Sequence, residues 1–189
     1  MDRLRRVLDG HASPRNALLA FAAFNALQYH LMATVLPSFV ERFGVLPPDP
    51  GAVMAPATAI VSNMRALGAP GCRAYLREWV PADVALPLLG SLWLCLSLAA
   101  LKNSLSAWLS WLPGWLPLIG LGVAVFDLAE NALFVLLCRE ADAPSGGLAR
   151  AAAWTSGLKV LFICAGVVSV LVLLVVRGVF WCRRRVKQA

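Results

Sequence analysis

Hydrophobic side chains along the chain gather into four long runs, separated by short segments that are rich in Pro, Gly and charge. The runs cover residues 16–40, 81–101, 114–138 and 154–180. A helix of about 20 mostly apolar residues can cross the hydrocarbon core of a bilayer, and Pro, Gly and charged residues are typical of helix ends. The pattern therefore predicts an all-α protein, a membrane-embedded four-helix bundle forming one transmembrane domain over residues 1–189.

The only sizeable segment between the runs is 41–80, which we expect to form an extramembrane loop. Within it, residues 58–67 and 71–79 predict two short helices, broken at a Gly-Ala-Pro-Gly sequence over 68–71. The second short helix carries two aromatic and two basic residues: Tyr75, Trp79, Arg73 and Arg77. Two interpretations are open: a helix that lies on the membrane surface with its aromatic rings at headgroup level, or a cap packed over the bundle.

Composition supports a membrane rather than water as the solvent of this chain. Hydrophobic residues make up 60% of it and charged residues only 14%, whereas soluble domains have about 25% charged residues. The net charge is +7, but the basic residues flank the apolar runs. That placement indicates contact with anionic lipid rather than with nucleic acid.

The distribution of basic residues predicts the orientation. Of the 17 Lys and Arg residues, ten fall on the side of the two termini, counting Arg177 near the end of the fourth run, six fall on the other side, and Lys159 lies within the fourth run. The positive-inside rule then places both termini in the cytoplasm, or on the matrix side in an organelle. The pattern does not say which membrane holds the protein.

The third run contains the most informative residues of the chain. Asp127, Glu130 and Asn131 are spaced i, i+3, i+4, so a helix places all three on one face. An ionised carboxylate at the bilayer centre costs at least about 2.5–3.5 kcal/mol. These three side chains are therefore expected to point into the protein interior.

Two further ionisable residues are predicted at the same level of the membrane. Counting about 1.5 Å of rise per residue from the outer surface places Glu130 about 12 Å deep, Asp127 about 16 Å, Lys159 about 8 Å and His30 about 15 Å. We expect Lys159 to pair with one of the two carboxylates, which leaves the other either protonated or paired with a charged His30. Asn131 is expected to donate to a carboxylate. The candidate site is thus Asp127, Glu130, Asn131, Lys159 and His30.

A secondary set of charged residues lies near the outer end of the second run. It consists of Asp83, Arg73 and Arg77.

No pattern in the sequence implies a cofactor or a catalytic residue. P-loop, Rossmann and G-x-S-x-G motifs are absent. The five cysteines form no C-x-x-C pair, so neither a disulfide framework nor a zinc ribbon is indicated. His30 with Asp127 and Glu130 would be a chemically plausible ligand set, but no ligand spacing supports it, and we predict no metal.

Part of the chain resembles a loose family of small four-span integral membrane proteins of unknown function. The matching residues run from about residue 60 to residue 168 and are most specific in the D-x-x-E-N segment of the third run: Leu67, Gly68, Arg73, Tyr75, Asp83, Pro87, Phe126, Asp127, Glu130, Asn131 and Lys159. The resemblance implies a four-span fold and carries no activity.

Three functions are compatible with these features. The first is a non-enzymatic accessory or scaffold component, in which the polar residues hold helices together. The second is an intramembrane lipid-binding protein, or an enzyme that acts on a hydrophobic substrate. The third is a small proton-coupled transporter. Expected partners are membrane lipids, and also other membrane subunits or further copies of this chain; nucleic acid is not among them.

Overall fold

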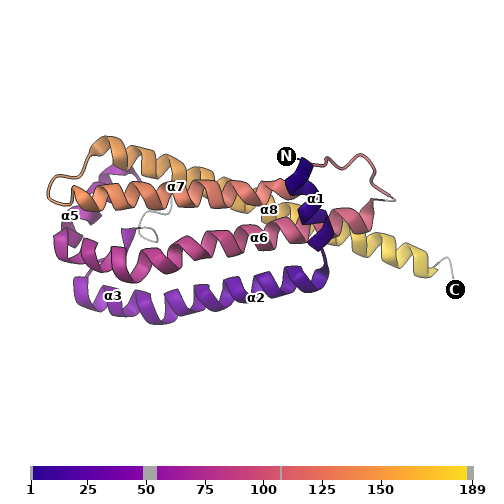
Figure 1. Cartoon of the computed structure of the whole chain (residues 1–189), viewed down its shortest axis with the longest axis horizontal. Coiled ribbons are helices and arrows are strands. Elements are labelled where there is room, and N and C mark those ends of the chain that lie inside the picture. The colour runs from indigo at the N-terminus through magenta and orange to yellow at the C-terminus, as the bar shows by residue number, and fades with distance from the viewer. Residues whose placement is uncertain (1, 49–54, 107, 187–189) are drawn as a thin grey trace.

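The computed structural model describes residues 2–48, 55–106 and 108–186. The described residues form helices and contain no strand, so the prediction of an all-α protein is confirmed (Figure 1). Four helical segments are long and apolar enough to cross a membrane: Pro14–Phe43, Ala57–Leu105, Leu116–Arg139 and Gly146–Arg184. These segments support a multi-pass membrane protein.

The first segment is one continuous helix with a π-helical turn in its middle. It is built from α2 (Pro14–His30), η1 (Leu31–Val35) and α3 (Leu36–Phe43). The Ser13 hydroxyl caps its start by accepting from the Asn16 amide at 3.1 Å. Gly44 ends it with a φ of 69°, in the left-handed region that glycine adopts without steric cost.

The segment that follows packs over the end of the bundle opposite the two termini. It consists of α5 (Ala57–Ala74), which a non-helical Gly68 with a φ of 60° divides, and of a π-helical turn η2 (Tyr75–Trp79). The predicted break at 68–71 is therefore present, but η2 continues directly into the next helix. Tyr75 and Trp79 are 0% and 1% exposed, so these aromatic rings lie in the protein core. Of the two interpretations of residues 71–79, the structure has the packed cap and not the helix on the membrane surface.

Three long helices complete the bundle: α6 (Val80–Leu105), α7 (Ile119–Arg139), which follows the short η3 (Leu116–Leu118), and α8 (Gly146–Val186). α7 packs against both α6 and α8, while α2 packs mainly against α6. The 41 residues of α8 span about 60 Å. Because the hydrocarbon core is about 30 Å thick, α8 extends well beyond the predicted span 154–180.

The N-terminal flank forms a further helix that the hydrophobic pattern did not predict, α1 (Asp2–His11). It packs against α6. Figure 1 shows α1 and the C-terminal end of α8 toward the same end of the bundle, and the α3–α5 and α7–α8 connections at the other end. This arrangement is what four membrane crossings require.

Glycine allows α6 and α7 to approach closely at one point. A Cβ atom on Gly120 of α7 would lie 2.9 Å from the Ser91 carbonyl oxygen and 2.8 Å from the Cys95 sulfur, both on α6. On α8, by contrast, a Cβ atom on Gly157 would meet nothing within 4 Å. Replacing Gly120 by alanine therefore tests close packing between the helices, whereas replacing Gly157 tests only the intrinsic preference of the residue for a helix.

We predict that Gly120→Ala destabilises the bundle by about 1–3 kcal/mol, because the α6 backbone must move to make room for the methyl group. Gly157→Ala is the matched control. It should be neutral or slightly stabilising, since alanine favours helix over glycine by about 1 kcal/mol. Thermal unfolding in a mild detergent measures both. Equal melting temperatures for the two variants would contradict the close approach at Gly120.

Candidate functional site

The polar stripe of α7 faces the interior of the bundle. Asp127, Glu130 and Asn131 are 9%, 0% and 3% exposed. Because α7 lies between α6 and α8, a stripe about one turn long is covered from both sides. The three polar side chains thus lie inside the protein, where they avoid the free-energy cost of placing an ionised group in hydrocarbon.

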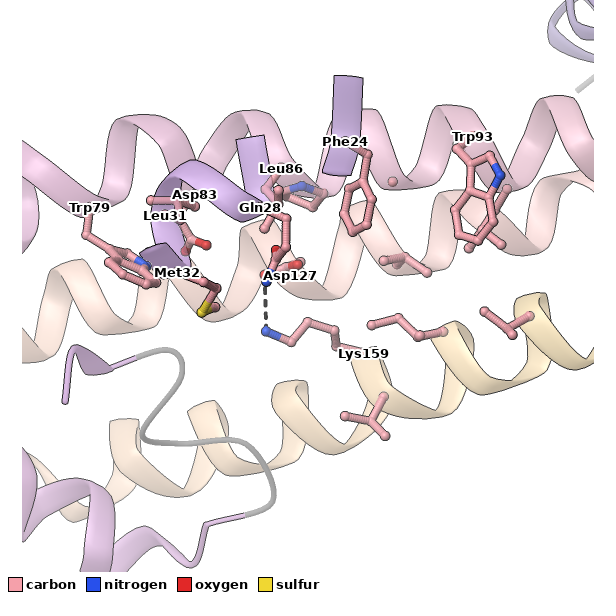
Figure 2. Close-up of a pocket in the computed structure, with 17 residues that line it drawn as sticks. Phe24, Gln28, Leu31, Met32, Trp79, Asp83, Leu86, Trp93, Asp127 and Lys159 are labelled. Atoms are coloured by element: carbon pink, nitrogen blue, oxygen red, sulfur yellow. Dashed lines mark hydrogen bonds and ion pairs between the residues drawn. The ribbon is translucent and has the colours of Figure 1, made fainter. Parts of the chain in front are cut away.

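Lys159 of α8 reaches both acids of this stripe. Its Nζ lies 2.5 Å from Glu130 Oε2 and 3.3 Å from Asp127 Oδ1. The lysine is only 6% exposed, so solvent screens these contacts weakly. Figure 2 shows the lysine stem extending from α8 toward Asp127. The bridge ties α7 to α8 at one level of the membrane.

Asn131 makes a different bond from the one that the sequence suggests. Its Nδ2 donates to the backbone carbonyl of Asp83 at 3.4 Å and not to a carboxylate. Asn131 lies one residue beyond Glu130, so the helix turns it toward α6, whereas Glu130 meets α8. The contact brings Asp83, which is 2% exposed, into the cluster from the first turn of α6.

The remaining predicted residues lie elsewhere. His30 is exposed at the end of α2, and Arg73 and Arg77 are exposed on α5 and η2. The structure therefore brings together Asp83, Asp127, Glu130, Asn131 and Lys159 and leaves out the three other basic side chains. Among the described residues, no group of three or more His, Cys, Asp or Glu side chains is arranged so that it could hold a metal ion.

A cavity of about 330 Å³ opens beside this cluster. Its charged lining comes from Asp83, Asp127 and Lys159, while most other lining residues are apolar or aromatic. Figure 2 shows it between α2, α6 and α8, with the Lys159–Asp127 contact at its centre. α2 and α8 both pack on α6 but do not pack extensively on one another. The cavity thus occupies the seam between two helices whose outer faces are apolar.

Several lining residues were not predicted from the sequence. Phe24, Gln28 and Leu31 of the first segment line the cavity, and their i, i+4, i+7 spacing is the signal that could have found them. His30 lies two residues from Gln28, which is about 200° around a helix of 3.6 residues per turn. The depth predicted for His30 concerns only its position along the helix axis. Its side chain points away from the cavity.

Two π-helical turns border the cavity. η1 contributes Leu31 and Met32, and η2 contributes Trp79. Such turns are rare and occur frequently at functional sites, because each widens the helix and redirects the side chains that follow. Here both turns direct large side chains toward one space.

Four charged residues of the cluster are buried. Within the part of the chain that the structure describes, the buried acidic and basic residues are Asp83, Asp127, Glu130 and Lys159. Lys159 contacts two of these acids, Glu130 and Asp127. A buried carboxylate is stable only when it is paired, hydrogen-bonded or protonated.

One buried donor also lacks a partner. The Trp79 side chain lines the cavity, and its Nε1 has no hydrogen-bond acceptor among the described residues. In Figure 2 this nitrogen lies on the side of the indole toward Asp127. Buried donors are normally satisfied, so this atom indicates an acceptor on something that enters the cavity.

Comparisons with protein-family models, with curated proteins and with solved structures give no match. The resemblance of the D-x-x-E-N segment to small four-span membrane proteins therefore stays a prediction. Functional inference for this chain depends on the cluster and the cavity themselves.

Removing the lysine tests the charged cluster. We predict that Lys159→Met destabilises the protein by about 3–5 kcal/mol, because it leaves buried carboxylates without their cation. The double variant Lys159→Met with Glu130→Gln should recover part of this loss, since one buried charge is removed with its partner. Thermal unfolding in detergent gives both values.

The matched control is the exposed ion pair that Arg42 makes with Glu78. Arg42→Gln should change stability little, because water screens exposed pairs. If Lys159→Met is no more harmful than Arg42→Gln, the buried cluster does not hold α7 and α8 together.

Proposed function

We propose that this protein is a multi-pass membrane protein that binds one lipid-sized amphipathic ligand between its helices. The observation that carries this proposal is the cavity that has charged residues on one side and apolar residues over most of its lining. Sites for small ligands are typically apolar clefts of about 300–1,000 Å³ with a few placed polar groups. The volume of about 330 Å³ falls in this range.

A second cavity supports a ligand that has a chain. It measures about 360 Å³, shares Trp93 with the first cavity, and continues between α2, α6 and α8 toward Leu174. From Lys159 to Leu174 the helix rises about 22 Å. The two cavities thus line a furrow along α6 that suits an extended hydrocarbon chain, with the polar end at Lys159.

The seam between α2 and α8 supplies a route from the bilayer. Both helices expose large apolar residues along their outer faces, among them Leu18 and Leu19 on α2 and Leu171 on α8. A ligand that leaves the lipid phase sideways need not cross water. With both termini on the cytoplasmic or matrix side, the polar end of the cavity lies in the outer half of the membrane.

A second candidate function is an accessory or scaffold component whose partners are other membrane subunits or further copies of this chain. The bridge from Lys159 to Glu130 favours it, because it ties α7 to α8. Polar contacts between membrane helices contribute only about 0.6 kcal/mol on average. A contact of that strength stabilises the bundle little in comparison with the cost of burying four charged residues. A purely structural role also leaves the cavity without a function.

Filling the furrow tests ligand binding. Val167 lines the first cavity, whereas its neighbour Val168 is 56% exposed on the lipid face. We predict that Val167→Trp lowers the amount of lipid that co-purifies in mild detergent by about tenfold, or about 1.4 kcal/mol. Val168→Trp should retain it, as should the unaltered chain. Mass spectrometry of the extracted lipid, quantified per protein, measures the loss.

Equal lipid content in the two tryptophan variants would overturn the proposal, because the same substitution would then act equally inside and outside the furrow. Unaltered protein that carries no lipid above the level of detergent-exchanged controls would overturn it as well.

A further inference from the structure

Two buried cysteines from distant parts of the chain meet at one end of the bundle. Cys72 lies in the second half of α5, after the break at Gly68, and Cys138 lies in the last turn of α7. Their side chains share a hydrogen bond, and both belong to one apolar cluster that also contains Tyr75. The two thiol groups are thus in contact although they lie far apart in the sequence.

The remaining three cysteines lie elsewhere. Cys95 packs against Gly120, which is about 27 Å along α7 from Cys138. Cys164 and Cys182 are exposed and lie about 27 Å apart along α8. Neither arrangement suits a disulfide, so these cysteines serve as references for the contacting pair.

Contact between two thiols meets the first requirement for a disulfide, because sulfur atoms that already touch need little backbone movement to be joined. The hydrogen bond itself contributes little, since a thiol is a weak donor and a weak acceptor. A disulfide would instead close a long loop and remove much of the conformational freedom of the unfolded chain. α5 already packs against α7, so the bridge would add a covalent link to an existing contact.

The predicted topology places the cysteine pair on the side of the membrane where disulfides persist. Figure 1 shows α5 and the α7–α8 connection at the end of the bundle opposite the termini. The basic residues predict that the termini face the cytoplasm or the matrix, so the pair is expected on the other side. Disulfides form and persist in compartments outside the cytoplasm, where reducing thiol systems do not keep cysteines reduced.

We propose that Cys72 and Cys138 form a thiol–disulfide site: a small disulfide, such as glutathione disulfide, oxidises the pair, and the resulting bridge ties the packed cap to the end of α7. This inference does not rest on the proposed function, because neither cysteine lines the cavity.

The reaction proceeds by two exchange steps. Cys138 is 8% exposed and Cys72 is 2% exposed, so Cys138 is the residue that meets the external disulfide first. Its thiolate attacks one sulfur of that disulfide, which forms a mixed disulfide and releases one thiolate. Cys72 then attacks the Cys138 sulfur and releases the second thiolate. The two cysteines lose two electrons and two protons, and the external disulfide gains them as two thiols.

Oxidation of the full-length protein in a neutral detergent tests the site. Protein reduced with dithiothreitol and freed of it is incubated with glutathione disulfide. The remaining thiols are blocked with N-ethylmaleimide under denaturing conditions, and the peptides are identified by mass spectrometry. We expect two peptides joined through Cys72 and Cys138, and a melting temperature roughly 5–10 °C above that of the reduced protein. Exposed Cys182 should acquire a mixed disulfide with glutathione in the same sample, which shows that the oxidant was active.

Single variants then locate the effect. Cys72→Ala and Cys138→Ala should each abolish the joined peptides and the rise in melting temperature that glutathione disulfide causes. The comparison is made between oxidised and reduced samples of the same variant, so a general loss of stability does not affect it. Cys95→Ala is the matched control, since Cys95 is also buried. It should keep the joined peptides and the full rise in melting temperature.

Two results would overturn the proposal. One is free thiols at both Cys72 and Cys138 in a sample whose Cys182 has reacted, and the other is a bridge from either residue to a different cysteine. Joined peptides without a rise in melting temperature would overturn the role of the bridge in tying the packed cap to α7. The lipid content of Val167→Trp tests the proposed function separately, because that variant leaves the cysteine pair unchanged.

Discussion

Burial of Lys159 among acids is the interaction on which the rest of this structure depends. A lysine inside a hydrocarbon solvent is expensive, and it is tolerated here because Glu130 and Asp127 meet its ammonium at 2.5 and 3.3 Å. These contacts require α7 and α8 to lie at a fixed height and rotation relative to one another. α7 in turn is fixed to α6 through the close approach at Gly120 and the bond from Asn131 to the Asp83 carbonyl.

The first transmembrane segment is held less tightly than the other three. It packs on α6 and, through η1, on η2, but it has no extensive contact with α8. The cavity is a consequence of this difference, because three helices fixed by polar contacts leave a seam that α2 does not close. The packed cap formed by α5 and η2 covers one end of that seam and brings the buried Trp79 side chain to it.

Much of the fold could be predicted from the sequence because apolar runs and buried charges are strong signals. The four helices follow from run length, and the cluster of Asp127, Glu130 and Lys159 follows from counting helical rise along two runs. Counting residues along a helix gives the depth of a side chain but not the direction in which it points around the helix axis. For this reason His30 was predicted in the site and Gln28 was not. Whether residues 71–79 lie on the membrane or on the protein depends on tertiary packing, since a buried Trp79 and an interfacial Trp79 have the same local sequence.

The predicted depth of the acids below the membrane surface restricts what the cavity can hold. A ligand whose polar group reaches Asp127 must leave the headgroup layer, since this residue is expected about 16 Å deep. Leaving water costs a charged group several kcal/mol unless the site returns the lost interactions. A neutral lipid headgroup gains hydrogen bonds there, and a charged one meets Lys159 as well as the two acids. Any polar group that enters must therefore be compatible with the contact between Lys159 and Asp127, since both side chains line the same space.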